Sequence, residues 1–301
     1  MKIILFCLTV LLTGSLRTSE VRAAEIIAVK NGHRIDITID GKHFTSYCFS
    51  GDGKYPFFYP LNGPLSGGSV TSLRNAVYPH HTSLFLGCDM VNGGNYWQEG
   101  PDLGRILSLN ACIAGQGGDT AVITDECIWI RPGAFSPVRD MRKYTITAPS
   151  SAMIQIDFDI TLEMLTDVTI QKTNHSLFSA RMASDLSVAN GGTMINARGD
   201  TGEKETFGIP SPWIDYHGKR GNFTEGLTIM QHPSNPWYPS PWFTRDYGFM
   251  SPTPMYWPEN GEETFLEKGT KLRLRYRVII HSGNHREAGI AGEFEKYKIL
   301  K

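Results

Sequence analysis

Histidines gather in three polar stretches of this 301-residue sequence. The first stretch contains His80 and His81, the second contains His175, and the third contains His232. Imidazole titrates near neutral pH, so a histidine can act as a base, as an acid or as a metal ligand. These four histidines are therefore the first acid–base candidates of the chain.

Two carboxylates lie in or beside the same stretches. Glu99 follows Asn95-Tyr96-Trp97-Gln98, and Asp215 lies within Trp213-Ile214-Asp215-Tyr216-His217. Either carboxylate could orient an imidazole or act as the second acid–base group. Glycoside cleavage by two carboxylates depends on their separation in space, which the order of residues along the chain does not define.

The stretches are also dense in aromatic side chains. Aromatic rings stack on the apolar faces of sugars, while polar side chains hydrogen-bond the hydroxyl groups. A guanidinium group in such a site stabilises developing negative charge, a role we assign to Arg245. The expected substrate contacts are Asn95, Trp97, Trp237, Trp242, Arg245 and Tyr247. The alternative is that these aromatic residues pack loops onto the core.

Metal binding is a second chemistry open to the four histidines. No HxH or HxxxH spacing occurs among them, and the cysteines form no CxxC pair, so we assign no metal ligand. If a disulfide forms, Cys112 and Cys127 are the best local pair. The sequence has no GxSxG elbow, P-loop, HExxH or dinucleotide fingerprint. Nucleotide-dependent chemistry is therefore disfavoured, and no particular cofactor is indicated.

The N-terminus has the pattern of an export signal. Lys2 precedes an apolar run over residues 3–12, and Val21-Arg22-Ala23 fits a signal peptidase site. The run is shorter than the roughly 20 residues that cross a bilayer. We expect residues 1–23 to be a signal peptide and the mature chain to be periplasmic or extracellular, without membrane insertion. A net charge of −1 argues against a nucleic-acid partner.

Strand patterns dominate the rest of the chain. Apolar residues alternate with polar ones over residues 33–39, 153–165 and 272–281, and Asn31-Gly32 and Asp40-Gly41 favour tight hairpin turns. Residues 55–118 are rich in Gly, Pro and aromatics, as in functional loops. A helix is expected only over residues 286–298, capped by Asn284. The predicted fold is all-β: one domain over residues 24–301, with two large antiparallel sheets and a short C-terminal helix.

Several blocks together resemble the family named DUF6807, or "PmoA-like". They are Tyr55–Pro64, Tyr78-Pro79-His80-His81 running to Gly93 and Tyr96-Trp97, Trp213-Ile214-Asp215, His232-Pro233-Ser234-Asn235-Pro236, Trp242–Gly248 and Tyr276–Gly283. Thr82-Ser83 follow His81 where family members often have Arg-Gly, which removes one arginine that could meet an anionic group. The resemblance implies a β-supersandwich like that of galactose mutarotase and several polysaccharide lyases. A methane-oxidising membrane subunit is excluded, because the mature chain has no apolar stretch of about 18 residues.

These observations lead to one principal hypothesis and two alternatives. The principal hypothesis is a secreted carbohydrate-active enzyme that cleaves or isomerises a glycoside by His/carboxylate acid–base catalysis, as a hydrolase, a lyase or an epimerase. The first alternative is a carbohydrate-binding protein without catalysis on the same scaffold. The second is a metal-dependent enzyme whose histidines are the ligands.

Overall fold

The computed structural model describes residues 23–301 except 75–76, 99, 175 and 256–262. Among the expected functional residues, Glu99 and His175 therefore lie outside the described residues. The predicted signal peptide lies outside them as well, apart from Ala23.

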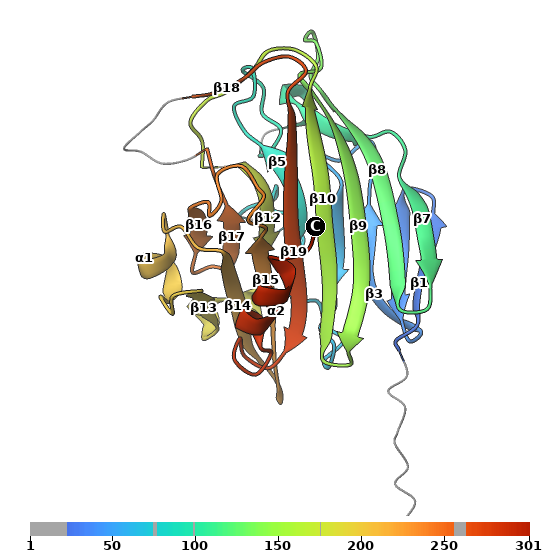
Figure 1. Cartoon of the computed structure of the whole chain (residues 1–301), viewed down its shortest axis with the longest axis vertical. Helices are drawn as coiled ribbons and strands as arrows, with labels where there is room; N and C mark the ends of the chain where they lie inside the picture. The colour runs from blue at the N-terminus through green and yellow to red at the C-terminus, as the bar shows by residue number, and fades with distance from the viewer. Residues whose placement is uncertain (1–22, 75–76, 99, 175, 256–262) are drawn as a thin grey trace, which may run out of the picture.

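Two large antiparallel sheets form the body of the molecule (Figure 1). The eight-stranded sheet contains, in spatial order, β1 (Ile26–Asn31), β2 (Arg34–Ile39), β3 (Lys42–Cys48), β4 (Phe57–Leu61), β5 (Leu84–Cys88), β12 (Ser176–Arg181), β17 (Phe249–Pro252) and β16 (Trp242–Arg245). The nine-stranded sheet contains β13 (Thr193–Asn196), β14 (Trp213–Arg220), β15 (Phe223–Gln231), β19 (Lys271–Ser282), β10 (Met153–Met164), β9 (Val138–Ser150), β8 (Thr120–Ile130) and β6 (Arg105–Ser108), with β7 (Cys112–Gly117) also paired to β8.

The remaining elements are short. β11 (Val168–Ile170) pairs with β18 (Thr264–Leu266) in a separate two-stranded sheet. The helices are η1 (Pro101–Leu103), η2 (Ser184–Leu186), η3 (Val188–Asn190), α1 (Gly202–Thr206) and α2 (Ile290–Tyr297).

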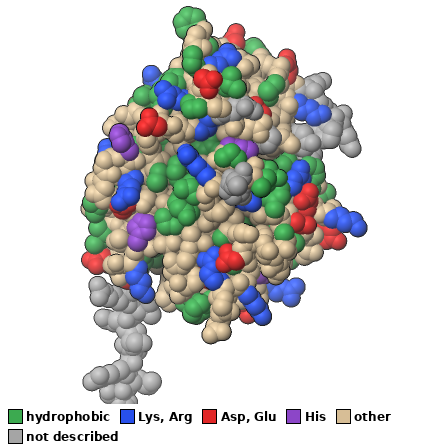
Figure 2. Space-filling model, turned by 180° about the vertical axis from the view of Figure 1, so that it is seen from behind, with side chains coloured by type: hydrophobic (Ala, Val, Ile, Leu, Met, Phe, Trp, Pro, Cys, Tyr) green, Lys and Arg blue, Asp and Glu red, His purple; other side chains and the backbone are tan. Residues whose placement is uncertain are grey.

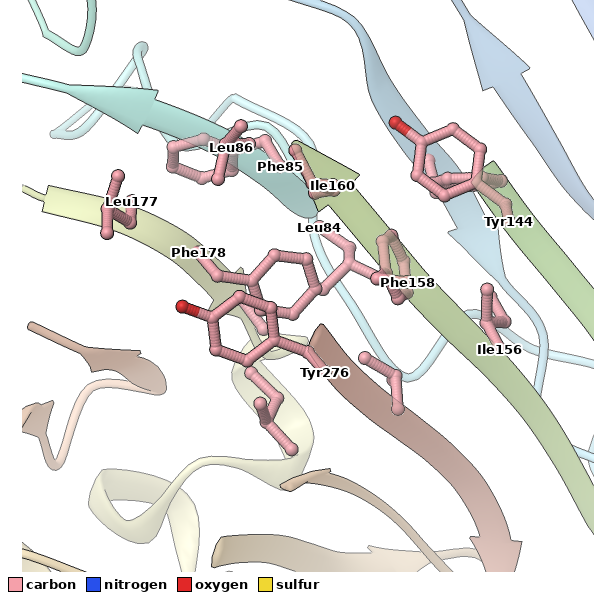
Figure 3. Close-up of a cluster of buried hydrophobic side chains, with 14 of the residues drawn as sticks. Leu84, Phe85, Leu86, Tyr144, Ile156, Phe158, Ile160, Leu177, Phe178 and Tyr276 are labelled. Carbon is pink, nitrogen blue, oxygen red and sulfur yellow. The ribbon is translucent and has the colours of Figure 1, made fainter. Parts of the chain in front are cut away.

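The core lies between the two sheets, where alternate residues of facing strands meet (Figure 3). Phe178 of β12 stacks on Tyr276 of β19, with ring centroids 4.6 Å apart, and meets Phe158 of β10 edge-on at 4.7 Å. Successive side chains of a strand point to opposite faces, so the alternating pattern in β10 and β19 places one apolar set in this core. The all-β fold with two large antiparallel sheets is confirmed.

The C-terminal helix begins later than the sequence predicted. α2 starts at Ile290, because Gly289 has a positive φ of 64° that an α-helix does not accommodate. Asn284 still caps this region, since its Oδ1 accepts the N–H groups of Arg286 and Glu287. Ile290, Phe294 and Tyr297 are buried on the predicted face of the helix, and they cover the outer side of β14, β15 and β19 (Figure 1).

The best local candidate for a disulfide, Cys112 with Cys127, is not paired. The cysteines of the described residues are free thiols. Cys112 lies opposite Thr124 in the β7–β8 ladder, with its Sγ 3.1 Å from the threonine Oγ1, while the Cys127 thiol donates to Asp125. Strand register, which sequence distance does not report, keeps the two cysteines apart. Over the described ranges, no helix has both the length and the apolar character needed to cross a bilayer.

Candidate functional site

A cationic and aromatic cluster lies on the outer face of the eight-stranded sheet. Phe178 and Ala180 of β12 belong to the core, so the alternation of the strand turns Arg181 to the opposite face. β12 pairs with β17, where Phe249 lies directly opposite Arg181. We call Tyr78, His80, His81, Arg181 and Tyr247 the Arg181 cluster.

The members of the Arg181 cluster contact one another closely. The Arg181 Cζ lies 4.4 Å from the ring centroid of Tyr247 and 5.4 Å from that of Tyr78. Arg181 Nη1 is 3.5 Å from His81 Nδ1 although the two residues are 100 positions apart. The Tyr78 ring stacks on both His81 and Tyr247, with centroids 4.8 Å apart in each case. Figure 2, which views the molecule from the side of this sheet, shows hydrophobic and basic side chains gathered on this face.

The electrostatics of the Arg181 cluster are unusual. Arg181 is buried, and burial lowers the pKa of its guanidinium, yet arginine stays protonated in proteins. Among the described residues, no carboxylate forms an ion pair with Arg181, and its Nε has no hydrogen-bond partner. The aromatic faces of Tyr78 and Tyr247 partly offset the cost of burying the charge. Such a cation is suited to meet an anionic group of a ligand.

The imidazoles supply proton-transfer groups in the same place. The rings of His80 and His81 meet edge-on, with centroids 4.5 Å apart, and His81 also stacks on Phe249 at 4.5 Å. Tyr55 donates a hydrogen bond to the His80 carbonyl at 2.6 Å, which anchors this loop to the sheet. Burial, with the neighbouring Tyr78 ring, raises the pKa of Tyr247, so its hydroxyl remains a hydrogen-bond donor. The structure thus brings together three of the expected site residues: His80, His81 and Tyr247.

Two expected sugar-stacking tryptophans lie in the core instead. Trp97 is 0% exposed and packs against Phe85 and Phe249, and Trp242 is 0% exposed and donates from Nε1 to the Ser211 carbonyl. Neither indole has surface for a sugar to stack on. Their large apolar area is better accommodated in the protein interior, which is the alternative that the sequence left open.

Two other expected substrate contacts, Arg245 and Asn95, are engaged in contacts within the protein. Arg245 pairs with Glu203 at 3.0 Å and lies over the rings of Phe207 and Phe243, so its charge is already compensated. Asn95 accepts the N–H groups of residues 97 and 98 through Oδ1, and so shapes its own loop. Trp237 is 38% exposed, the most accessible of the three predicted tryptophans.

His232 belongs to the opposite sheet and packs the C-terminus. Its Nε2 is 3.0 Å from the Leu300 carbonyl, its Nδ1 accepts the Ser234 N–H, and its ring meets Tyr297 of α2 edge-on. Burial, and then the nearby Arg275, lower the pKa of His232. The structure therefore places His232 away from His80 and His81, in a structural contact.

A second titratable cluster lies on the outer face of the nine-stranded sheet, where α2 packs. Asp215 and His217 alternate along β14 and share this face with His281 of β19. Asp215 Oδ1 is 2.6 Å from His217 Nδ1, and Asp215 Oδ2 is 2.7 Å from His281 Nε2. Thr228 donates its hydroxyl to Oδ2 at 2.6 Å. We call Asp215, His217, His281 and His285 the Asp215 cluster.

The Asp215 cluster holds a buried negative charge. Burial alone would raise the pKa of the Asp215 carboxyl, but the His281 ring and the hydrogen bonds from both histidines outweigh burial and hold this pKa well below its usual range. Burial lowers the pKa of His285. His281 Nδ1 faces the Gly283 carbonyl at 3.2 Å, so both ring nitrogens of His281 face oxygen acceptors. Both Asp215 oxygens and both His281 nitrogens therefore have polar partners within the protein.

Several of these residues were absent from the sequence-based candidates. Arg181, His217, His281 and His285 belong to this group. Signals for them existed: Asp215 and His217 are two residues apart on a strand, and His281 and His285 have HxxxH spacing. For Arg181 the sequence offers no comparable signal, because its partners come from distant strands.

Solved structures that are similar to this chain include two epimerase-fold proteins and a polysaccharide lyase. Galactose 1-epimerase from Lactobacillus acidophilus is 9% identical with a TM-score of 0.42, covering 87% of this chain and 100% of that one. The GalM/aldose epimerase homologue from C. elegans is 9% identical with a TM-score of 0.33, covering 87% and 99%. The heparan sulfate lyase HepC from Pedobacter heparinus is 8% identical with a TM-score of 0.34, covering 83% and 30%.

The sequence comparisons give a family but no individual relative. No curated protein matches the sequence. A family model described as "Family of unknown function (DUF6807)" matches residues 34–295, and that description does not carry the PmoA-like label. Because the match extends over most of the chain, this protein belongs to the DUF6807 family.

Proposed function

We propose that this protein is a carbohydrate-active enzyme whose site is the Arg181 cluster. The observation that carries the proposal is the buried Arg181 guanidinium, which contacts His81 and two tyrosine rings and has no carboxylate partner among the described residues. Aromatic rings offer faces for sugars, and tyrosine hydroxyls offer hydrogen bonds. The export signal expected at the N-terminus adds the proposal that the enzyme acts in the periplasm or outside the cell.

The arrangement favours chemistry that builds up negative charge on the substrate. A preorganised cation aimed at a developing oxyanion stabilises the transition state. His80 and His81 would remove and return the proton as general base and acid. Removing a proton next to a carboxylate or carbonyl leads either to elimination of a leaving group or to return of the proton on the other face. We therefore favour lyase or epimerase chemistry over hydrolysis, which relies on a pair of carboxylates.

Product analysis of the mature protein with neutral and carboxylated oligosaccharides tests this proposal. Elimination yields an unsaturated fragment that absorbs ultraviolet light and carries no added water. Epimerisation in deuterated water exchanges a ring proton, which NMR detects. Hydrolysis adds one water to the products and would contradict the favoured reaction, while saturable binding without any product would support the non-catalytic alternative.

The Arg181→Gln variant tests whether the Arg181 cluster is the active site. Losing a group that stabilises the oxyanion lowers kcat by about 100-fold to 1000-fold. The matched control is Arg273→Gln, because Arg273 pairs with Asp159 on the exposed face of the other sheet. Stability should barely fall in Arg181→Gln, since no ion pair with a described carboxylate is lost; thermal unfolding checks this. Full kcat in both Arg181→Gln and His81→Gln would overturn the assignment.

A further inference from the structure

The Asp215 cluster contains a donor set that the proposed function does not use. Asp215, His217 and His285 each offer one ligand atom, and these atoms all lie within 4.8 Å of one another. Strand alternation fixes the first two on the outer face of β14, and the third comes from the segment between β19 and α2. The fold therefore brings His285 close to Asp215 and His217, although it lies far from them in the sequence.

The chemistry of this set suits a divalent transition-metal ion. One carboxylate and two imidazoles are ligands that zinc and its neighbours accept. Two ligand atoms, each about 2.1 Å from one ion, lie at most about 4.2 Å apart. Closing the set around an ion therefore needs a movement on the order of half an ångström.

The surroundings of Asp215 match those of a metal ligand. Its Oδ2 is held by His281 and Thr228, at 2.7 Å and 2.6 Å. Such outer hydrogen bonds orient a ligating carboxylate and tune its affinity. Gly226 keeps the space open: a Cβ at this position would lie 2.7 Å from the His217 Cβ and 2.8 Å from the His281 Cε1.

His285 supplies a second and independent observation. Its Nδ1 is buried and has no hydrogen-bond partner in the described part of the chain. Buried polar atoms almost always have a partner, so an orphaned ring nitrogen points to a missing group. The His285 ring lies 5.7 Å from the His217 ring.

We propose that Asp215, His217 and His285 bind a divalent transition-metal ion, with His281 and Thr228 holding the carboxylate in place. Three protein ligands leave one position of a tetrahedral ion for water or a ligand group. The bound ion would tie the segment before α2 to β14.

Metal titration of the mature chain tests the site. The protein is purified without a metal-affinity tag, treated with a chelator, and titrated with Zn²⁺ by calorimetry and with Co²⁺ by visible spectroscopy. One ion per chain is expected, with a Co²⁺ spectrum typical of nitrogen and oxygen ligands and a higher melting temperature with Zn²⁺. His285→Ala should weaken binding at least tenfold, and His217→Ala should do the same.

The matched control is His33→Ala, an exposed histidine outside the Asp215 cluster whose ring meets Phe49 edge-on. His285 is only half-buried, so His285→Ala should keep the melting temperature of the metal-free protein. Absence of stoichiometric binding by the wild-type protein would overturn the proposal. Unchanged affinity in His285→Ala would overturn it as well, because the ion would then be bound elsewhere.

Discussion

The Arg181 cluster and the Asp215 cluster lie on the outer faces of different sheets. They differ in the sign of the buried charge and in whether that charge has a partner. Arg181 is a buried cation that rests on tyrosine rings and has no described carboxylate beside it. Asp215 is a buried anion whose two oxygens both face hydrogen-bonding groups. The Arg181 cation has no described counter-charge, whereas the Asp215 carboxylate is met by hydrogen bonds within the protein.

The difference separates two uses of a buried charge. Burying an unpaired charge costs stability, so its persistence points to a ligand that supplies the counter-charge. A compensated charge fixes the positions of its neighbours, here the imidazoles of His217 and His281. The Arg181 cluster is thus the better candidate for substrate chemistry, and the Asp215 cluster the better candidate for a preorganised metal site.

Asp215→Asn is the substitution expected to cost the most stability. The amide keeps the shape of the side chain but removes the charge that faces His217 and His281. Breaking a buried charge pair costs about 3–5 kcal/mol of unfolding free energy, because the partner stays buried. Urea unfolding followed by tryptophan fluorescence measures this loss. Asp185→Asn is the matched control, since its ion pair with Arg220 is at the surface and contributes up to about 1 kcal/mol.

The same variant has an expected pH dependence. The pKa of Asp215 is lowered in the folded protein, so its carboxylate stabilises the fold above the unfolded pKa of about 4, and this contribution is lost progressively as pH falls below that value. Between about pH 5 and pH 3, wild-type stability should therefore fall more steeply than that of Asp215→Asn. Equal slopes would contradict the idea that Asp215 is a compensated anion.

Gly226→Ala probes how tightly the Asp215 cluster is packed. The added Cβ would lie 2.6 Å from the Tyr216 carbonyl oxygen and 2.7 Å from the His217 Cβ. Overpacking of this kind costs about 1–3 kcal/mol, measured by urea unfolding. The control is Gly117→Ala on β7, where an added Cβ has no atom within 4 Å. Similar unfolding free energies for the two variants would show that the imidazoles have room to move.

His232→Gln tests a histidine that belongs to neither cluster, and its effect should be the smallest. Losing the hydrogen bond to the Leu300 carbonyl costs about 1 kcal/mol. Because the folded protein lowers the pKa of His232, its neutral form stabilises the fold above about pH 6.5, and this contribution falls as the pH drops. The variant should therefore lose less stability than the wild type between pH 7.5 and pH 5.5. If the His232→Gln variant stays stable but loses enzymatic activity, His232 would again be a candidate catalytic residue.

The local spacing of apolar and polar residues was enough to predict many of the strands and the C-terminal helix. Ile35 and Ile37 alternate with polar residues and are buried in β2, and Ile290, Phe294 and Tyr297 form the buried face of α2. Period-two and period-3.6 patterns depend only on backbone geometry, so they can be read along a single chain. The start of α2 was missed because the positive φ of Gly289 is a property of the folded turn.

The sequence by itself determined the strand pattern, the sandwich class and the membership in DUF6807, along with the histidines at positions 80 and 81 as candidates. Only the tertiary structure decided which of the candidates meet. It placed β12 between β5 and β17, which brings Arg181 to His81 and Tyr247, and it placed His232 under the C-terminus. The reason is physical: neighbours across a sheet are set by strand order and register, which arise from packing of the whole core and leave no local periodicity in the chain.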